Sequence, residues 1–264
     1  MKKFLVIGNP IEHSLSPTLH NYWIKNSGID AIYEKQKLNE NELEQITLQV
    51  KEKKIDGINV TVPFKKIIIP YLDELTSEAK KTESVNTIYL QRDRVIGHNT
   101  DIGGFEISLR KFKYDIQNKN VFLLGAGGVA PSIIYALNKM KVSKIFLSNR
   151  SKEKAINLEK LFANLTVVDW GEIPDFDIVI NATSLGLNKE DKISLDFSNV
   201  GKNKLFYDVI YNPQETNFLK TGKDLGNITV NGKLMFIYQA FLAFQIWHQI
   251  KPKVNEEVSK LLDK

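Results

Sequence analysis

The segment Val121-Phe122-Leu123-Leu124-Gly125-Ala126-Gly127-Gly128-Val129-Ala130 joins an apolar run to a glycine-rich loop and then to a helical pattern. The loop reads GxGxxA, with a predicted strand before it and a predicted helix after it. Gly125 permits a tight turn, Gly127 allows backbone N–H groups to approach a pyrophosphate, and small Ala130 lets helix and strand pack closely. Residues 125–130 therefore predict a dinucleotide site, and a glycine turn without a ligand is the alternative.

The residues after the next predicted strand, 144–148, indicate which dinucleotide is bound. The spacing from Gly125 to Asn149 is 149 − 125 = 24 residues, close to the offset at which an NAD site places an acid for the ribose 2′-hydroxyl. This chain instead has Asn149-Arg150-Ser151-Lys152, with Lys154 beyond. We therefore expect NADP, with Arg150 on the 2′-phosphate and Lys154 assisting. An ordinary surface charge is the alternative reading of Arg150.

Short β-branched runs alternate with longer amphipathic segments on both sides of this loop, which predicts an α/β fold with parallel sheets. Predicted strands are 4–8, 31–36, 57–62, 121–124, 144–148, 166–168, 176–182 and 205–209, with a hairpin or bent pair at 85–91 and 94–97. Predicted helices are 17–27, 41–53, 129–140, 152–162, 234–249 and 252–262. Because the pattern restarts near residues 102–118, we expect two domains.

Composition narrows the class of protein. The chain has 264 residues, no Cys, and four histidines that lie far apart, so we expect neither disulfides nor a metal site. Net charge is +5, yet only four of the 36 cationic residues are Arg, which argues against a nucleic-acid partner. The apolar runs are too short for a signal peptide or a membrane span, so we expect a cytoplasmic protein without a membrane partner.

Polar clusters in the N-terminal part of the chain have residue types that are unusual both for a buried core and for a loop that only connects two elements. Ser14 and Ser16 precede a predicted helix; Ser16 has the position of a helix cap, and two hydroxyls there also suit a carboxylate ligand. Asn59, Thr61 and Lys65 follow a strand, at the edge where open α/β sheets bind ligands.

Two further clusters, Val85-Asn86-Thr87 and Asn99-Thr100-Asp101, lie beside strands. Asx residues in such places most often form turns. A lysine that exchanges protons near neutral pH needs an orienting partner, and the Asp101 carboxylate is suited to orient Lys65.

In this order, the segments resemble the shikimate dehydrogenase family. The matching strings are Ser14-Leu15-Ser16-Pro17 with His20-Asn21, Asn59-Val60-Thr61-Val62-Pro63-Phe64-Lys65, Val85-Asn86-Thr87, Asn99-Thr100-Asp101, the glycine loop, Asn149-Arg150, Asn181-Ala182-Thr183-Ser184-Leu185-Gly186, Asp208-Val209-Ile210-Tyr211, Asn231-Gly232 and Gln239-Ala240. One departure is Glu83-Ser84, where members commonly carry Gly-Ala before Val-Asn-Thr.

The resemblance implies an oxidoreductase that reversibly reduces 3-dehydroshikimate to shikimate with NADP, in aromatic amino acid biosynthesis. It implies that Lys65 and Asp101 are catalytic and act in proton transfer. It assigns substrate binding to Ser14, Ser16, Asn59, Thr61, Asn86, Tyr211 and Gln239. It assigns cofactor binding to Gly125, Ala126, Gly127, Gly128, Val129, Ala130, Asn149, Arg150, Lys154, Thr183, Ile210 and Gly232.

The resemblance also implies a two-domain α/β architecture. An N-terminal substrate-binding domain, 1–102, is completed by C-terminal helices that return to it, 236–264, and a Rossmann-type NADP-binding domain spans 103–235. We expect a small-molecule substrate and a monomer or homodimer. Two alternatives stay open: a quinate/shikimate dehydrogenase with broader substrate or cofactor use, and a non-catalytic NADP-binding sensor.

Overall fold

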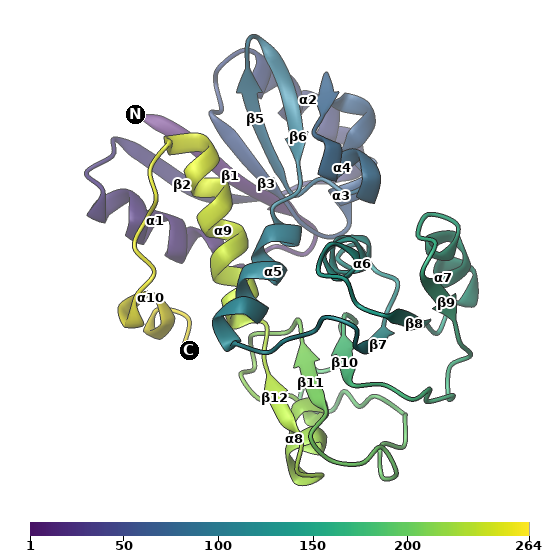
Figure 1. Cartoon of the computed structure of the whole chain (residues 1–264). Coiled ribbons are helices and arrows are strands. Elements are labelled where there is room, and N and C mark those ends of the chain that lie inside the picture. The colour runs from purple at the N-terminus through teal and green to yellow at the C-terminus, as the bar shows by residue number, and fades with distance from the viewer. Residues whose placement is uncertain (264) are drawn as a thin grey trace. The chain divides into compact units, whose positions relative to one another are not determined.

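A computed structural model describes residues 1–263 of the chain (Figure 1). It divides into two compact units, Met1–Gly104 with Ile237–Lys264, and Phe105–Phe236. Helices α5 (Asp101–Phe112) and α9 (Lys233–His248) each contain a boundary between the units. The domain boundaries expected from the sequence, at 102/103 and 235/236, lie within a few residues of these.

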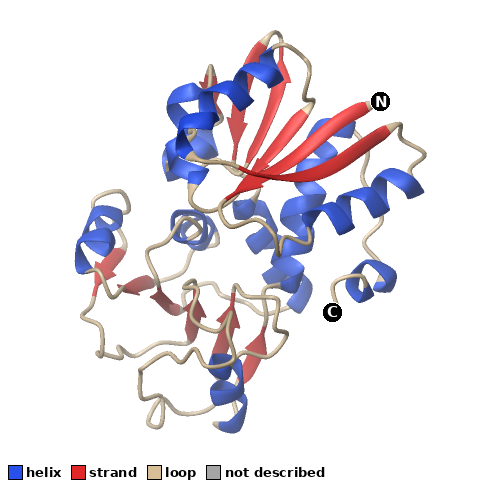
Figure 2. Cartoon of the chain, turned by 180° about the vertical axis from the view of Figure 1, so that it is seen from behind, coloured by secondary structure: helices blue, strands red, loops and turns tan. Residues whose placement is uncertain are grey.

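The first unit is built on a six-stranded mixed sheet with the order β2-β1-β3-β5-β6-β4. Its strands are β1 (Lys2–Gly8), β2 (Ala31–Lys37), β3 (Gly57–Val60), β4 (Glu74–Leu75), β5 (Thr87–Gln91) and β6 (Arg94–His98). The central strand β1 pairs in parallel with β2 and β3, whereas β5 is antiparallel to both β3 and β6. Figure 2 shows these strands fanning out with the usual twist.

Helices cover both faces of this sheet, so β1 is apolar throughout its buried part. Leu5 and Ile7 face a core formed with α2 (Leu43–Lys51), α3 (Phe64–Ile67) and α4 (Ser77–Thr82). Phe4 faces the opposite side, where its ring lies 5.0 Å from that of Trp247 in α9. Helix α1 (Ser16–Asn26) lies on this side with α9, and α10 (Glu256–Lys260) follows it (Figure 1).

The second unit contains a fully parallel sheet with the order β12-β11-β10-β7-β8-β9. The strands are β7 (Asn120–Leu124), β8 (Lys144–Ser148), β9 (Leu165–Val167), β10 (Ile178–Asn181), β11 (Leu205–Asp208) and β12 (Ile228–Val230). Counted within the unit, this is the 3-2-1-4-5-6 order of the dinucleotide-binding fold. The strand order reverses between β7 and β10, which is where such sheets bind their ligands.

Successive residues of β11 pack on opposite faces of this second sheet. Phe206 packs with Phe197 and with Phe218 of α8 (Asn217–Asp224). Tyr207 faces the other way, 5.2 Å from the ring of Phe105 in α5. Helices α6 (Ala130–Lys139) and α7 (Lys152–Glu159) follow β7 and β8 as crossover connections. The predicted α/β class is therefore confirmed, with a fully parallel sheet in the second unit and a mixed sheet in the first.

Several elements were not expected from the sequence. They are the short elements α3, α4, α8, β4 and β12, and the 12-residue helix α5. Helix α8 buries Phe218, Leu219 and Gly222 on one face, but it has only eight residues, which is shorter than the stretch over which helical periodicity is read. The expected hairpin is present as β5 and β6, and the expected helix 252–262 is shortened to Glu256–Lys260.

Candidate active site

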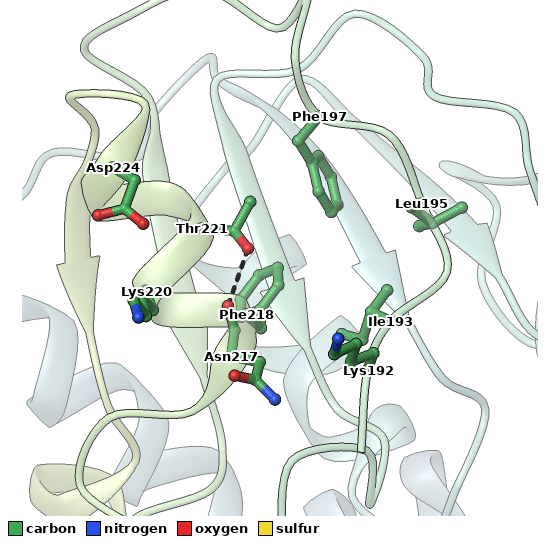
Figure 3. Close-up of a pocket in the computed structure, with 9 residues that line it drawn as sticks. All are labelled: Lys192, Ile193, Leu195, Phe197, Asn217, Phe218, Lys220, Thr221 and Asp224. Atoms are coloured by element: carbon green, nitrogen blue, oxygen red, sulfur yellow. Dashed lines mark hydrogen bonds between the residues drawn. The ribbon is translucent and has the colours of Figure 1, made fainter. Parts of the chain in front are cut away.

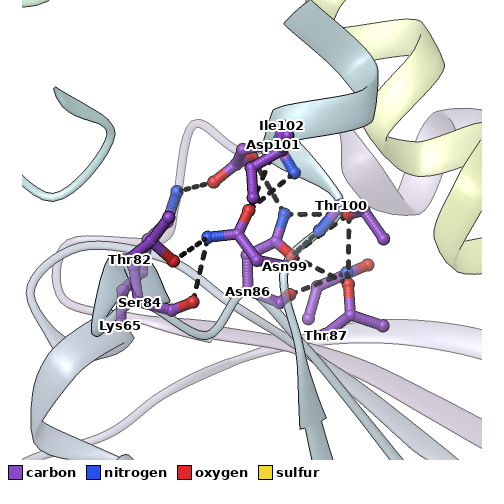
Figure 4. A network of polar contacts seen from close by, with 10 residues as sticks. Lys65, Thr82, Ser84, Asn86, Thr87, Asn99, Thr100, Asp101 and Ile102 are labelled. Atoms are coloured by element: carbon purple, nitrogen blue, oxygen red, sulfur yellow. Dashed lines mark hydrogen bonds and ion pairs between the residues drawn. The ribbon is translucent and has the colours of Figure 1, made fainter. Parts of the chain in front are cut away.

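Lys65 and Asp101, which are separated by 36 residues in sequence, form an ion pair in the first unit. Lys65 Nζ lies 2.6 Å from Asp101 Oδ2, and the two side chains are only 12% and 7% exposed (Figure 4). Lys65 is placed by the short α3 after β3, where Phe64 is buried in the core. Because an ammonium has three N–H groups, two remain for a ligand, and no residue among 1–263 takes them.

The start of α5 fixes the Asp101 carboxylate. Asn99 Oδ1 accepts the backbone N–H groups of Asp101 and Ile102, at 3.1 and 3.4 Å, and so closes the first turn of the helix. Asn86 Nδ2 donates to Asp101 Oδ1 at 2.9 Å (Figure 4). Asp101 therefore accepts one bond on each oxygen, and its charge lies at the positive end of α5.

The amides of Asn86 and Asn59 are tied into the same buried network. Asn86 Nδ2 also donates to Thr100 Oγ1 at 2.9 Å, while its Oδ1 accepts the Thr100 N–H at 2.7 Å. Asn59 Nδ2 donates to the Asn86 carbonyl at 3.0 Å and to Thr87 Oγ1 at 3.2 Å. Thr61 follows β3 directly and is half-buried. The structure thus brings Lys65, Asp101, Asn86 and Asn59 together at one end of the sheet.

The capping role considered for Ser16 is wrong. Helix α1 begins at Ser16 itself, its cap position is Leu15, and no side chain caps it. Instead, Ser14 Oγ accepts the Ser16 backbone N–H at 3.3 Å, so the two serines are adjacent at the helix start. Ser16 is buried and Ser14 half-buried. The Ser16 hydroxyl is therefore not used for helix capping, whereas the Ser14 hydroxyl accepts the first N–H of the helix.

The glycine loop of the second unit has the conformation that its sequence predicts. Gly125 has φ +104°, and a Cβ there would lie 2.8 Å from Thr183 Cγ2, so glycine is required. Gly127 and Gly128 are exposed between β7 and α6, whereas Ala130 is fully buried against the sheet. This loop, with an accessible backbone at a helix start, is a cradle suited to a pyrophosphate.

The end of β8 lies beside this loop. Asn149 Oδ1 accepts the Ala126 N–H at 3.0 Å, which joins the two segments. Arg150 and Lys154 are exposed, and neither forms an ion pair with another residue in the described part of the chain. Lys152, by contrast, lies 2.5 Å from Asp169. Two unpaired cations at this strand end are compatible with a ligand phosphate.

Comparison with known proteins finds a matching family model for each of the two units. Residues 6–88 match the family described as shikimate dehydrogenase substrate binding domain, and residues 106–209 match shikimate / quinate 5-dehydrogenase. A shikimate dehydrogenase (NADP(+)) from Pelagibacter ubique is 56% identical over 99% of both chains. The chain belongs to the shikimate dehydrogenase family.

Solved structures of shikimate dehydrogenases share the fold. The enzyme from Aquifex aeolicus superposes with a TM-score of 0.90 at 38% identity, covering 99% of this chain and 97% of its own. The enzyme from Thermus thermophilus, in complex with NADP(H) and shikimate, gives 0.89 at 28% identity, covering 100% and 98%.

Two buried polar residues, Asn181 and Asp208, hold the loops that carry predicted cofactor contacts of this shikimate dehydrogenase. They are paired in register at the ends of β10 and β11, with Asn181 Nδ2 3.1 Å from Asp208 Oδ1. Asn181 Oδ1 accepts Thr183 Oγ1–H at 2.6 Å, and Asp208 accepts the Ile210 N–H at 3.0 Å. Burial raises the pKa of Asp208 to about 6. Neither had been expected as a site residue, although a polar residue that ends an apolar strand run is a readable signal.

The remaining predicted residues are placed as follows. Gly232 donates its N–H to Ile210 O at 3.0 Å, and a Cβ there would lie 2.0 Å from the Val209 carbonyl oxygen, so close packing alone explains this glycine. Tyr211 stacks on Phe236 with ring centroids 4.3 Å apart. Gln239 lies on α9 in the part that belongs to the first unit. Contact of Tyr211 and Gln239 with a common substrate stays a prediction.

Glu83-Ser84, which departs from the Gly-Ala common in the family, forms the turn that follows α4. Glu83 ends α4 in the left-handed conformation, φ 46° and ψ 40°, which glycine adopts most easily. Its side chain is paired with Lys66 at 2.5 Å on the surface. The turn still delivers Ser84 O to Asn99 Nδ2 at 2.9 Å.

One pocket in the second unit lies away from these residues. It has a volume of about 280 Å³ between α8 and residues 192–197, with Phe197 and Phe218 on its wall (Figure 3). None of the predicted site residues lines it. Across residues 1–263 there is no group of three or more His, Asp or Glu placed to hold a metal ion, and no helix with the length and apolarity to span a membrane.

Proposed function

We propose that this protein catalyses the reversible NADP-linked reduction of 3-dehydroshikimate to shikimate, a step in aromatic amino acid biosynthesis. The observation that carries the proposal is the nearly buried Lys65–Asp101 pair, in which the ammonium keeps two N–H groups for a ligand. Membership of the shikimate dehydrogenase family supports it.

Lys65 is the proposed proton donor and acceptor. When the substrate carbonyl is reduced, its oxygen gains negative charge, and an N–H of Lys65 donates a proton to it. In the oxidation direction, neutral Lys65 takes the proton of the substrate hydroxyl. Asp101, at 2.6 Å, holds the amine in place, and Asn86 holds Asp101 in turn.

The substrate contacts are proposed from the polar groups around this pair. The hydroxyl groups of Ser14 and Ser16 at the start of α1 would bind the carboxylate, and Tyr211 is a further proposed substrate contact. The other proposed contacts, which bond the ring hydroxyl groups, are Asn59, Thr61, Asn86, Asp101 and Gln239. The amide hydrogens of Asn59 and Asn86 are already donated within the protein. Since Asn86 Oδ1 also accepts the Thr100 N–H and the Thr87 hydroxyl, acceptor capacity is left mainly on Asn59.

The residues of the second unit fit NADP. The Gly125 turn and the exposed backbone of Gly127 would receive the pyrophosphate, and Arg150 with Lys154 would hold the 2′-phosphate. The other proposed contacts are Ala126, Gly128, Val129, Ala130, Asn149, Thr183, Ile210 and Gly232. When bound, the nicotinamide supplies hydride transfer, and the chain supplies orientation and the proton.

The proposed binding of substrate and of cofactor is divided between the two units. The first unit would be the substrate domain and the second the NADP-binding domain, with boundaries at 102/103 and 235/236. A cytoplasmic location and a monomer or homodimer stay predictions.

The test is the absorbance of reduced nicotinamide with purified protein in four mixtures, shikimate or quinate with NADP+ or NAD+. The proposal predicts the fastest reduction with shikimate and NADP+. Comparable rates with quinate or with NAD+ would favour the broader quinate/shikimate dehydrogenase. No reduction in any mixture, together with binding of NADP+, would favour the non-catalytic sensor.

A further inference from the structure

The adjacent residues His20 and Asn21 on α1 have no role in the proposed chemistry, yet both contact Tyr33 of β2. Asn21 Nδ2 donates to the Tyr33 carbonyl at 2.8 Å, and Asn21 Oδ1 accepts the Tyr33 N–H at 2.9 Å. Because β2 is an edge strand, Tyr33 has no strand partner on that side, and the Asn21 amide takes that place. The backbone of Tyr33 is thereby fixed to α1.

His20 fixes the ring of Tyr33. The two rings are stacked with centroids 4.2 Å apart and planes 3° from parallel, and the two residues are 0% and 1% exposed. Neither ring nitrogen of His20 has a hydrogen-bond partner among residues 1–263, and burial lowers its pKa to about 3. His20 is therefore a neutral, flat packing surface that leaves the Tyr33 ring one position.

From that position, the Tyr33 hydroxyl reaches across β1 to the candidate active site. It donates to Asn59 Oδ1 at 2.7 Å, and it also interacts with the Ser16 hydroxyl. Asn59 Nδ2 uses both its hydrogens on Asn86 O and Thr87 Oγ1. One lone pair on Asn59 Oδ1 is thus the only hydrogen-bonding position of this amide that no residue among 1–263 occupies.

We propose that Tyr33 is a positioning residue that locks the Asn59 amide, so that its oxygen, and not its nitrogen, meets the substrate. The site then selects a ring hydroxyl that donates a hydrogen bond at this point. The inference rests on the proposed assignment of Asn59 as a substrate contact. Without the Tyr33 hydroxyl, Asn59 Oδ1 loses its buried donor, and only the two hydrogen bonds of Nδ2 still orient the amide.

The test compares Tyr33→Phe with Tyr22→Phe in the full-length enzyme. Tyr22 is the matched control, because its hydroxyl is 2.5 Å from Glu257 on the surface of the same unit. Tyr33→Phe is expected to raise KM for shikimate roughly tenfold, with kcat and KM for NADP+ changed less than about threefold. Tyr22→Phe is expected to leave all three unchanged.

A double-variant cycle with Asn59→Ala separates positioning from general damage. With Asn59 removed, Tyr33→Phe is expected to cause no further loss of kcat/KM for shikimate. If the effects of the two changes multiply, or if Tyr33→Phe leaves KM unchanged while the wild type is active, the inference is wrong and the proposed function stands. If the wild type is inactive, the proposed function itself fails.

Asn21→Ala provides a second variant should Tyr33→Phe not fold. It removes the side chain that holds the Tyr33 backbone, while Tyr33 and Asn59 themselves are not substituted. A rise in KM for shikimate that disappears in the Asn59→Ala background supports the inference, and an unchanged KM contradicts it.

Discussion

Replacing Arg150 by Ala is expected to reduce the use of NADP+ selectively. Arg150 is exposed at the end of β8 and has no ion-pair partner in residues 1–263, so its guanidinium is available to a ligand. A hydrogen bond to a charged group is worth about 1.5–3 kcal/mol, and tenfold corresponds to about 1.4 kcal/mol. Because exposure to solvent favours the lower end, kcat/KM for NADP+ should fall roughly tenfold. NAD+ lacks the 2′-phosphate, so its kcat/KM should change less than about twofold.

The assay is the initial rate of nicotinamide reduction at saturating shikimate, with each oxidised cofactor varied in turn. Lys152→Ala is the matched control, since it removes a neighbouring cation that is already paired with Asp169 at 2.5 Å. Equal losses for NADP+ and NAD+ in Arg150→Ala would refute the assignment. A loss of the same size in Lys152→Ala would show that general positive charge, and not Arg150, recognises the phosphate.

Three further changes have defined outcomes. Ser14→Ala should raise KM for shikimate and not for NADP+; an unchanged KM in steady-state assays would limit Ser14 to its local contact with Ser16. Asp208, with its pKa raised to about 6, keeps a proton in the folded state that the unfolded state releases near pH 4, so stability falls by roughly 3 kcal/mol as the pH rises from about 4 to 6. Urea unfolding of Asp208→Asn should lack this fall, and a pH dependence parallel to wild type would contradict it. Glu83→Gly relieves a left-handed conformation and loses only an exposed ion pair, so unfolding free energy should rise by about 0.5–1 kcal/mol; a lower Tm would be the contrary result.

The sequence predicts those parts of the fold whose patterns are local. The β7–loop–α6 unit is readable because Gly125 and Ala130 serve a geometry that lies within ten residues. Helix α8 and strand β12 are not readable in this way, since eight and three residues are shorter than the stretches over which a periodic pattern is recognised. Their positions depend on packing against β11, the strand that precedes them in the chain.

The residues of the candidate site could be proposed from the sequence, but the hydrogen bonds and ion pairs among them could not. Spacing indicates that Lys65 and Asp101 lie at strand ends, whereas the 2.6 Å contact depends on how Asn99 and Asn86 hold the start of α5. Tyr33 resembles an ordinary strand aromatic, because its function depends on a hydroxyl contact across β1. Chemistry-bearing residue types are visible in sequence, and the residues that orient them become visible in three dimensions.

The most direct test of the account is kcat for shikimate oxidation by Lys65→Ala, beside Lys66→Ala as the neighbouring control whose amine is exposed and paired with Glu83. Thermal unfolding confirms that each variant is folded before rates are compared, because Lys65→Ala leaves Asp101 without its partner. The account predicts a kcat at least roughly 100-fold below wild type, with KM for shikimate changed only a few-fold. A Lys65→Ala enzyme that is folded and turns over at the wild-type kcat would contradict it.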